Sequence, residues 1–566
     1  MTGTFNLLDE PWLLVTDLDS RSAEVSIQEA FARAHQLAGV RGDLPSQEVA
    51  LLRLLVSILY RALRVEGPLE QRMAAWGRWW VDGTLPVADV SGYLEAHRDR
   101  FDLLDPRAPF MQVAGLRAGK TSGLSKLVAD VPDGEQFFTT RAGQALDSIG
   151  LAEAARWLVH VHAFDPSGIK SGAVGDPRVK GGKGYPIGTG WGGQCGVLIP
   201  QGRTLKETLL LCLALQLESA GAGWGRDQPV WEREPHSAAP DRGHEEPSGT
   251  ADLLTWQARR VLLVTAGERV VDALICNGDA IHPRNRHQLE PHTAWRRSPH
   301  QEKLHGGTVY MPRGHNPERA LWRGLPGLLP QGVEQRPAGS TAAASLPPNV
   351  LEWLGLLVRD GALEAAYPVH LHAVGVSYGS QNSTIGSMVD DRLRLPAAIF
   401  AHRELATLAA DMVVASEGAV AALRGLAANL AQAAGEWETE GPRERAGEAG
   451  YAALDQRFRR WVAALLPDSD PEACLVEWHT HALRTINAIG ADLVRAAGQP
   501  AWVGRVVTTG AGVKHHVDAS LATAWFRAAL GSSLPQAATP PTRRPTETDT
   551  HQSTNHSVSA EARTEE

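Results

Sequence analysis

The sequence predicts an α+β protein: a large mixed α/β domain in residues 1–375, then a four-helix bundle in residues 397–532, then a disordered tail. Two observations predict this order. In the first part, apolar runs typical of strands alternate with helical periods, as in "QCGVLIP" followed by "TLKETLLLCLALQL". From about residue 397, long Ala- and Leu-rich stretches keep the helical period between short Gly- and Pro-containing breaks. The 566 residues give room for two to four domains with ample core.

The strongest helix of the first part covers residues 45–64, where Pro45 and Ser46 precede leucines spaced three and four residues apart. Weaker helical periods predict further helices at 25–37, 69–80, 87–99, 151–163, 204–217 and 349–358. Apolar runs predict strands at 194–200, 260–265, 271–275 and 370–376. Loops are predicted at 100–112, 125–150, 218–250 and 331–348.

The second part begins after a connecting segment, residues 376–396. The four bundle helices are predicted at 397–433, 445–466, 471–498 and 517–530. The tail, residues 533–566, is rich in Pro, Thr and Ser without an apolar period, so it is predicted to be disordered.

Composition excludes several classes of protein. The net charge of −9 gives no global sign of nucleic-acid binding, so any polyanion site must be a local patch. No apolar run approaches the roughly 18 residues of a membrane span, and no signal peptide is recognisable, which predicts a cytoplasmic protein. The four cysteines are far apart and form no CxxC pair, so we expect buried thiols rather than zinc or disulfides: Cys195, Cys212, Cys276 and Cys474.

No catalytic or cofactor site is predicted. Gly188, Gly190 and Gly193 satisfy GxGxxG, but a strand rather than a helix follows them, which argues against a dinucleotide site. His160 and His162 lie two residues apart on a predicted helix and therefore face different sides, as core or surface histidines do. Neither GxSxG, HExxH nor a P-loop occurs. We therefore expect no enzyme activity and no cofactor.

A glycine-rich basic segment, residues 164–193, favours phosphate binding. Glycine lets backbone N–H groups approach a phosphate or a base edge closely, and basic side chains add counter-charge. The basic residues of the segment are Lys170, Arg178, Lys180 and Lys183. The alternative is a plain flexible surface loop.

Two further stretches favour contact with DNA. Residues 281–303 are basic, and arginine or lysine can enter a minor groove; the alternative is a solvated loop. Residues 376–386, "VSYGSQNSTIG", offer the amides Gln381 and Asn382 among small residues. Such a turn could push between base pairs or hydrogen-bond base edges, and the alternative is a plain β-turn before a helix N-cap.

Taken together and in this order, these stretches resemble the CasA family, the large subunit of the type I-E CRISPR surveillance complex Cascade. The resemblance spans roughly residues 1–530 and is carried by "FNLLDEPWLLV", "LPSQEVALLRLLVSILYRAL", "RFDLLDPRAPFMQ", "IKSGAVGDPRVKGGKGYPIGTGWGGQCGVLI" and "TLKETLLL". It implies a non-catalytic subunit that reads the protospacer-adjacent motif (PAM) of double-stranded DNA from the minor groove. It also implies that the subunit starts unwinding for the guide RNA and helps recruit a separate helicase–nuclease.

The resemblance also implies site residues. A glycine loop falls on Asp165–Lys170, with Ser167, Gly168 and Ile169 inside it. A wedge falls on Ser380–Ser383; because Gln381 precedes Asn382 here, the opposite of the best-known order, either amide can be the wedge. A basic minor-groove residue falls near Arg286, with Arg284 and Lys303 as alternatives, and additional phosphate contacts are expected at Arg178, Lys180 and Lys183.

The remaining implied contacts are with RNA and protein. A loop at 128–147, with Phe137 and Phe138 as anchors, would dock near the guide RNA, and the bundle would contact the small subunit and the displaced strand. Other partners would be the backbone subunits and the subunit that binds the 5′ handle of the RNA. Relatives with a cysteine cluster differ from this chain, where Cys276 stands alone and predicts no zinc. The competing hypotheses are a scaffold that contacts RNA and neighbouring subunits without reading DNA, and a nuclease, which would need clustered acids or a metal.

Overall fold

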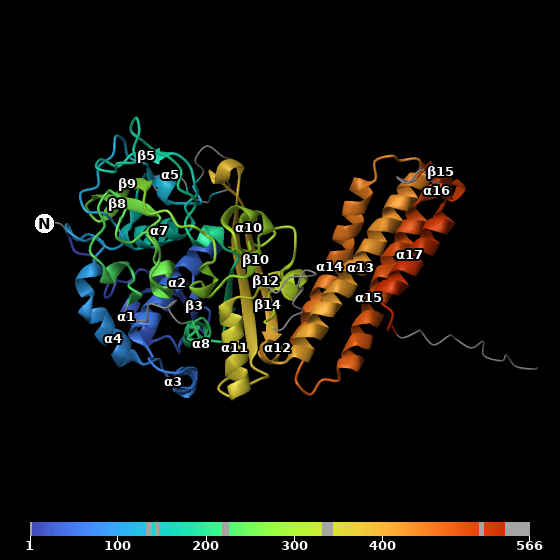
Figure 1. Ribbon diagram of the computed structural model, residues 1–566, viewed down its shortest axis with the longest axis horizontal. Coiled ribbons are helices and arrows are strands. Elements are labelled where there is room, and N and C mark those ends of the chain that lie inside the picture. The colour runs from blue at the N-terminus through green and yellow to red at the C-terminus, as the bar shows by residue number, and fades with distance from the viewer. Residues whose placement is uncertain are drawn as a thin grey trace, which may run out of the picture.

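The computed structural model describes residues 3–131, 139, 141, 147–217, 226–330, 343–508 and 514–537. Figure 1 shows two parts: an N-terminal part in which helices surround small sheets, and a C-terminal part of long, nearly parallel helices. The predicted α+β class is confirmed. The predicted tail lies outside the described residues from 538 onward.

The N-terminal part is organised around α2 (Pro45–Ala62), the helix that the sequence predicted most strongly. It begins with Pro45 at its first turn, and 14 of its 18 residues are buried. The other helices of this part are α1 (Ile27–Ala32), α3 (Leu69–Val81), α4 (Val87–Ala96), α5 (Leu124–Leu127), α7 (Leu151–Phe164), α8 (Leu205–Leu211), α9 (Thr250–Leu254), α10 (Pro299–His305), α11 (Asn349–Asp360) and α12 (Ala398–Ala401). Short 3₁₀ turns are η1 (Arg98–Arg100), η2 (Gly192–Gln194), η4 (Val230–Glu232), η5 (Arg286–Gln288), η6 (Leu321–Gly327) and η7 (Ser380–Asn382).

The strands form small antiparallel sheets. Three-stranded sheets have the orders β2-β1-β3, β4-β9-β8, β11-β10-β12 and β14-β13-β7, and β5 pairs with β6. Their bounds are β1 (Leu13–Asp17), β2 (Ser22–Val25), β3 (Leu37–Val40), β4 (Ile149–Gly150), β5 (Lys170–Ser171), β6 (Lys183–Gly184), β7 (Val197–Gln201), β8 (Arg259–Ala266), β9 (Arg269–Asn277), β10 (Trp295–Arg297), β11 (Tyr310–Pro312), β12 (Ser345–Leu346), β13 (Pro368–Tyr378) and β14 (Ile385–Pro396). The strands predicted at β7, β8, β9 and β13 are therefore confirmed.

Other predictions were wrong. Residues 25–37 were expected to be one helix, but α1 ends at Ala32 and β3 begins at Leu37. The helix expected over 204–217 ends at Leu211. In both runs the apolar spacing continues past the end of the helix because the residues that follow are buried too, among them Leu37 and Leu213. Such spacing does not by itself distinguish a helix from other buried backbone.

A long hairpin, β13–β14, replaces the connection expected at 376–396. The two strands stay in register from Pro368 opposite Pro396 to Ser377 opposite Ser387. β14 was missed because charged and polar residues occupy much of it, and its outer positions are exposed. Pairing with the apolar strand β13 holds it extended. The N-terminal sheet therefore continues to Pro396.

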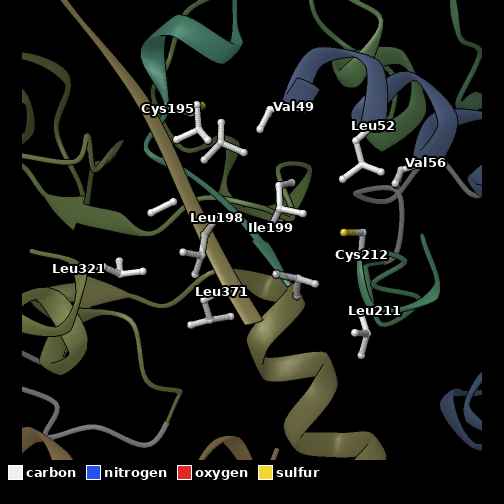
Figure 2. Packing of buried hydrophobic residues seen from close by; sticks show 14 of the residues in the cluster. Val49, Leu52, Val56, Cys195, Leu198, Ile199, Leu211, Cys212, Leu321 and Leu371 are labelled. Carbon is white, nitrogen blue, oxygen red and sulfur yellow. The ribbon is translucent and has the colours of Figure 1, made fainter. Parts of the chain in front are cut away.

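The base of this hairpin lies against the main core. Figure 2 shows Leu371 of β13 beside Leu198 of β7, with Ile199 facing Val49 and Leu52 of α2. All five side chains are almost entirely buried. Since close-packed interiors resist displacement, this packing gives the hairpin a rigid base.

The C-terminal part contains four long helices, α13 (Arg403–Ala434), α14 (Glu440–Ala463), α15 (Pro471–Ala496) and α17 (Ala519–Ser533), which pack side by side (Figure 1). α13 contacts the other three. By length and composition it could cross a membrane, but 67% of its most apolar window is buried, as expected of an inner helix of a bundle. The far end carries α16 (Gly498–Val503) and the hairpin β15 (Arg505–Thr508) with β16 (Lys514–Val517).

Polar contacts attach the bundle to the rest of the chain. Arg459 of α14 forms an ion pair of 3.0 Å with Asp391 of β14. Trp322 of η6 donates its indole N–H to Asp455 of α14 at 2.8 Å, and Arg323 pairs with Glu417 of α13 at 2.8 Å. The hairpin β13–β14 is therefore held away from its tip, both by the core and by the bundle.

Candidate nucleic-acid interface

The structure brings two predicted sites together. The glycine loop, Asp165–Lys170, and the end of the hairpin tip, Ser383–Ile385, line one pocket of about 310 Å³. Residues Ser125–Leu127 line it from a third segment. Two segments that lie more than 200 residues apart in the sequence thus form one surface feature.

The hairpin tip (Gly379–Thr384) has an unusual backbone. Gln381 and Asn382 both lie in the left-handed region, with φ of 54° and 55°, a conformation costly for residues other than glycine. Backbone hydrogen bonds from Gly379 to Thr384 and from Asn382 to Gly379 close the turn. The side chains of both residues are exposed. The segment is therefore a turn between two strands; the alternative of a turn leading to a helix N-cap is wrong.

Arg259 of β8 holds the glycine loop from below. Its side chain is 0% exposed, and it forms an ion pair with Asp165. The guanidinium also donates to the carbonyls of Pro166 at 3.0 Å and Gly188 at 2.9 Å. A buried guanidinium offers five donors in a fixed plane, so one side chain can fix several loop carbonyls.

Lys170 is turned inward, unlike the open charge expected from the sequence. Its ammonium lies 2.6 Å from Asp165, and its side chain is only 10% exposed. Burial alone would raise the pKa of Asp165, but Lys170 and Arg259 outweigh it and lower that pKa. Burial lowers the pKa of Lys170, against the pull of Asp165. In this structure the lysine stabilises the loop, whereas Ile169 is 59% exposed at its outer edge.

Two of the three GxGxxG glycines allow close packing, whereas Gly188 has φ of 102° and no atom within 4 Å of an added Cβ. A Cβ on Gly190 would lie 2.5 Å from the backbone of Ala163 at the end of α7. A Cβ on Gly193 would lie 2.0 Å from the hydroxyl of Tyr378, which donates to the carbonyl of Phe164 at 2.7 Å. The motif lets this chain segment pass closely under the glycine loop and the hairpin.

The basic residues after the glycine loop differ in their freedom. Arg178 is bound to Asp176 at 2.9 Å. Lys180 and Lys183 are exposed and face each other across a two-residue turn. That turn, Gly181–Gly182, has φ of 58° and 72°, the type I′ geometry that glycine favours in tight hairpins.

The basic segment 281–303 lies apart from this pocket. Arg286 pairs with Glu246 at 3.0 Å, and its side chain is 13% exposed. Arg284 is half-buried, and Lys303 is exposed on α10. Among the described residues, the pocket lining includes none of these three.

The remaining predicted residues are two phenylalanines, one cysteine and two histidines. Phe137 and Phe138 lie outside the described residues. Cys276 is buried, and the described part of the chain holds no group of three or more His, Cys, Asp or Glu side chains suited to a metal. His160 bonds to Ser46 at 2.9 Å, and His162 to the carbonyl of Met111 at 2.8 Å, so both are core histidines.

These histidines predict acid sensitivity. Burial lowers the pKa of His160 and of His162 to about 4, from about 6.5 in an unfolded chain. Between these values the unfolded chain binds protons that the folded chain does not, so stability falls as the pH drops below about 6.5. Unfolding by urea at pH values above and below 6 should show this loss. His160→Gln should make the pH dependence shallower; an unchanged pH dependence would contradict the assignment.

Some residues that shape the site were not predicted from the sequence. Arg259 was hidden because buried arginine in a strand is rare. Tyr378 lies in the segment 376–386, but the sequence of that segment does not indicate its hydrogen bond to the carbonyl of Phe164 at the end of α7. Lys120 and Lys126 belong to a Gly-rich basic stretch, "GLRAGKTSGLSK", which was a usable signal. Both are exposed near the glycine loop.

Comparisons with known proteins agree with this architecture. A family model described as CRISPR-associated protein Cse1 matches residues 6–489. The CasA/Cse1 protein of Thermus thermophilus is 31% identical over 333 residues, which cover 58% of this chain and 60% of that protein. The crystal structure of Thermobifida fusca Cse1 matches with a TM-score of 0.83 at 42% identity, covering 94% of this chain and 99% of that chain.

More distant structures share the fold. Cse1 from Acidimicrobium ferrooxidans matches with a TM-score of 0.76 at 28% identity, covering 94% of this chain and 99% of that chain. A chain in a structure named CRISPR RNA-guided surveillance complex matches with a TM-score of 0.63 at 22% identity, covering 87% of this chain and 98% of that chain. With the family model matched over most of its length, the chain belongs to the Cse1 family of CRISPR-associated proteins, also called CasA.

Proposed function

We propose that this chain is a non-catalytic, cytoplasmic subunit of a CRISPR RNA-guided surveillance complex, in which it reads the PAM of double-stranded target DNA. Membership of the Cse1 family supports a place in a surveillance complex, and a chain of the same fold occurs in such a complex. One observation supports the reading role. The glycine loop and the hairpin tip meet at one pocket, and the tip exposes two adjacent amides, Gln381 and Asn382.

The amides suit a minor-groove reader. Each carries donors and an acceptor, whereas the minor groove offers acceptors on every base pair and a donor only at G·C. Such readout is degenerate, which fits a sensor that accepts several related motifs. A wedge that unstacks one base step costs a few kcal/mol, and guide pairing offsets that cost because the duplex exchange is nearly balanced.

The glycine loop would supply close backbone contact. Gly168 has φ of 136°, and a Cβ built on it would lie 3.8 Å from the Cβ of Ser383. The loop therefore sits directly against the tip. Lys170 and Asp165 act as positioning residues in this proposal, while Arg284 or Lys303 remains available as the basic minor-groove residue.

The remaining partners rest on family membership. Guide RNA, the backbone, small and 5′-handle-binding subunits, and a helicase–nuclease recruited after target binding are the partners we propose. The long exposed sides of the bundle suit contact with a neighbouring subunit and with the displaced strand.

The test is duplex binding by the guide-RNA complex reconstituted with and without this chain. Targets carry a matched or a scrambled PAM at one fixed salt concentration. We expect the chain to create a preference for the matched PAM. An equal rise in affinity for both targets would favour the scaffold hypothesis, and metal-dependent cleavage by the chain alone would favour a nuclease.

A further inference from the structure

A second groove, of about 560 Å³, adjoins the tip pocket. Its wall is formed by Gly119–Ser122, Lys126, Ile169–Ser171, Gly181–Lys183 and Ile275. It shares Lys126, Ile169 and Lys170 with the pocket at the hairpin tip. The pocket at the hairpin tip and this second groove therefore form one continuous surface. We call the second groove the lysine groove.

Lysine is concentrated here. The chain has only eight lysines, against a combined 55 lysines and arginines. Five of the eight lie in or beside the groove, although the charge of one, Lys170, is offset by its ion pair with Asp165: Lys120, Lys126, Lys170, Lys180 and Lys183. Among the described residues, no carboxylate side chain lines the groove. In a chain of net charge −9, this is a local positive surface of the kind that a polyanion needs.

The choice of lysine indicates how a ligand would be held. Arginine fixes a phosphate through a planar fork, whereas lysine is a mobile point charge that tolerates many geometries. Hydroxyls of Thr121, Ser122 and Ser171 are the other polar side chains of the groove, and its apolar members are Ile169 and Ile275. No aromatic side chain lines it for base stacking among the described residues, which favours a phosphate backbone over bases.

The geometry of the Gly181–Gly182 turn supports the same reading. The turn sets Lys180 directly opposite Lys183, with backbone N–H to O distances of 3.1 Å in both directions. Like charges opposite each other in an antiparallel pair repel. An anion lying along the exposed turn removes that cost, and the two glycines let it approach the backbone.

We propose that the lysine groove binds the phosphate backbone of the target duplex on the side of the motif that the tip reads. This inference rests on the proposed function, because the groove is identified as a DNA site by its continuity with the tip pocket. The contacts would add affinity without sequence preference, since phosphates carry no sequence information.

The experiment uses the reconstituted complex and the double variant Lys120→Ala/Lys183→Ala. Affinity for matched and scrambled duplexes is measured across a series of salt concentrations. Each lost phosphate contact lowers the slope of log affinity against log salt by about 0.9, so we expect a slope shallower by about 1.8 on both duplexes. The preference for the matched PAM should remain.

Two matched controls sharpen the result. Lys120→Arg/Lys183→Arg keeps both charges and should keep the slope of the parent protein. Lys514→Ala removes an exposed lysine of β16 at the far end of the bundle and should change neither duplex (Figure 1).

The outcomes separate this inference from the proposed function. An unchanged slope in the double variant overturns the lysine groove, whatever the PAM preference. The inference is also overturned if the double variant loses guide RNA or fails to assemble while the chain alone binds duplex DNA as the parent chain does. That outcome would favour a contact between the groove and RNA. A parent complex without PAM preference overturns the proposed function, while a reduced slope would still support a phosphate-binding groove.

Discussion

Arg259→Met is expected to lower the free energy of unfolding by about 3–5 kcal/mol, because it leaves a buried carboxylate without one of its two cations. Asp165 retains Lys170, but the carbonyls of Pro166 and Gly188 lose their buried donor. The glycine loop then loses the side chain that binds its carbonyls, although the ion pair of Asp165 with Lys170 and the backbone bond from Gly190 to Asp165 remain. We expect PAM preference to fall even at temperatures where the variant remains folded, and chemical denaturation together with duplex binding measures both effects.

Arg260 provides a matched control on the same strand. Its side chain is equally buried, but it holds different loops: it donates to the carbonyls of Ser237 at 2.8 Å and Ala239 at 3.1 Å, and it pairs with Asp279 at 2.8 Å. Arg260→Met should cost a similar free energy of unfolding and leave PAM preference intact. Equal loss of preference in both variants would mean that general destabilisation, and not the glycine loop, accounts for the effect.

Gln381→Gly/Asn382→Gly is expected to abolish the preference for a matched PAM while leaving the fold intact. Both positions have positive φ, where glycine is favoured and other residues carry a backbone cost of roughly 1–2 kcal/mol. Removing that cost offsets the greater freedom that glycine gives the unfolded chain. The free energy of unfolding should therefore stay within about 1 kcal/mol of the parent value. Duplex binding by the reconstituted complex is the functional measurement.

Ser20→Gly is the control for the backbone effect. Ser20 has φ of 65° and lies exposed in the turn between β1 and β2, in a different sheet from the tip. It should show the same small change in stability and full PAM preference. Single variants at the two tip positions then identify the amide that acts as the wedge. A double glycine variant that still discriminates would remove the tip from the reading mechanism.

The sequence predicted those parts of the fold in which a long apolar period repeats. α2, α7 and the four bundle helices are of this kind, because each must bury a continuous apolar stripe. β14 was missed because Asp390, Asp391 and Arg392 give it the composition of a loop. Its extended conformation comes from pairing with β13, an interaction between strands that the period of one segment cannot reveal.

The sequence predicted the two segments of the candidate site but not that they would lie side by side. The glycine loop and the tip were identified from composition and resemblance, but their common pocket arises from the meeting of α7 and the end of β13. Lys170 was expected to be an open charge, but it pairs with Asp165, and that carboxylate is buried against Arg259 of β8, 94 residues further along the chain. Local sequence records the charge of a side chain, whereas burial and pairing depend on distant segments.

In the hairpin tip, the side chains proposed to read DNA are not the groups that close the turn. Its turn is closed by backbone bonds from Gly379 to Thr384 and by the hydroxyl of Ser383 donating to the carbonyl of Ser380. In the described chain, no hydrogen bond that stabilises the turn uses the side-chain amide of Gln381 or Asn382. Under the proposed function, substitutions at these two positions can therefore change which motif is read while the hairpin that presents them keeps its structure. If the proposed function holds, motif specificity can evolve at these two positions without rebuilding the hairpin, provided that the new side chains tolerate a left-handed backbone.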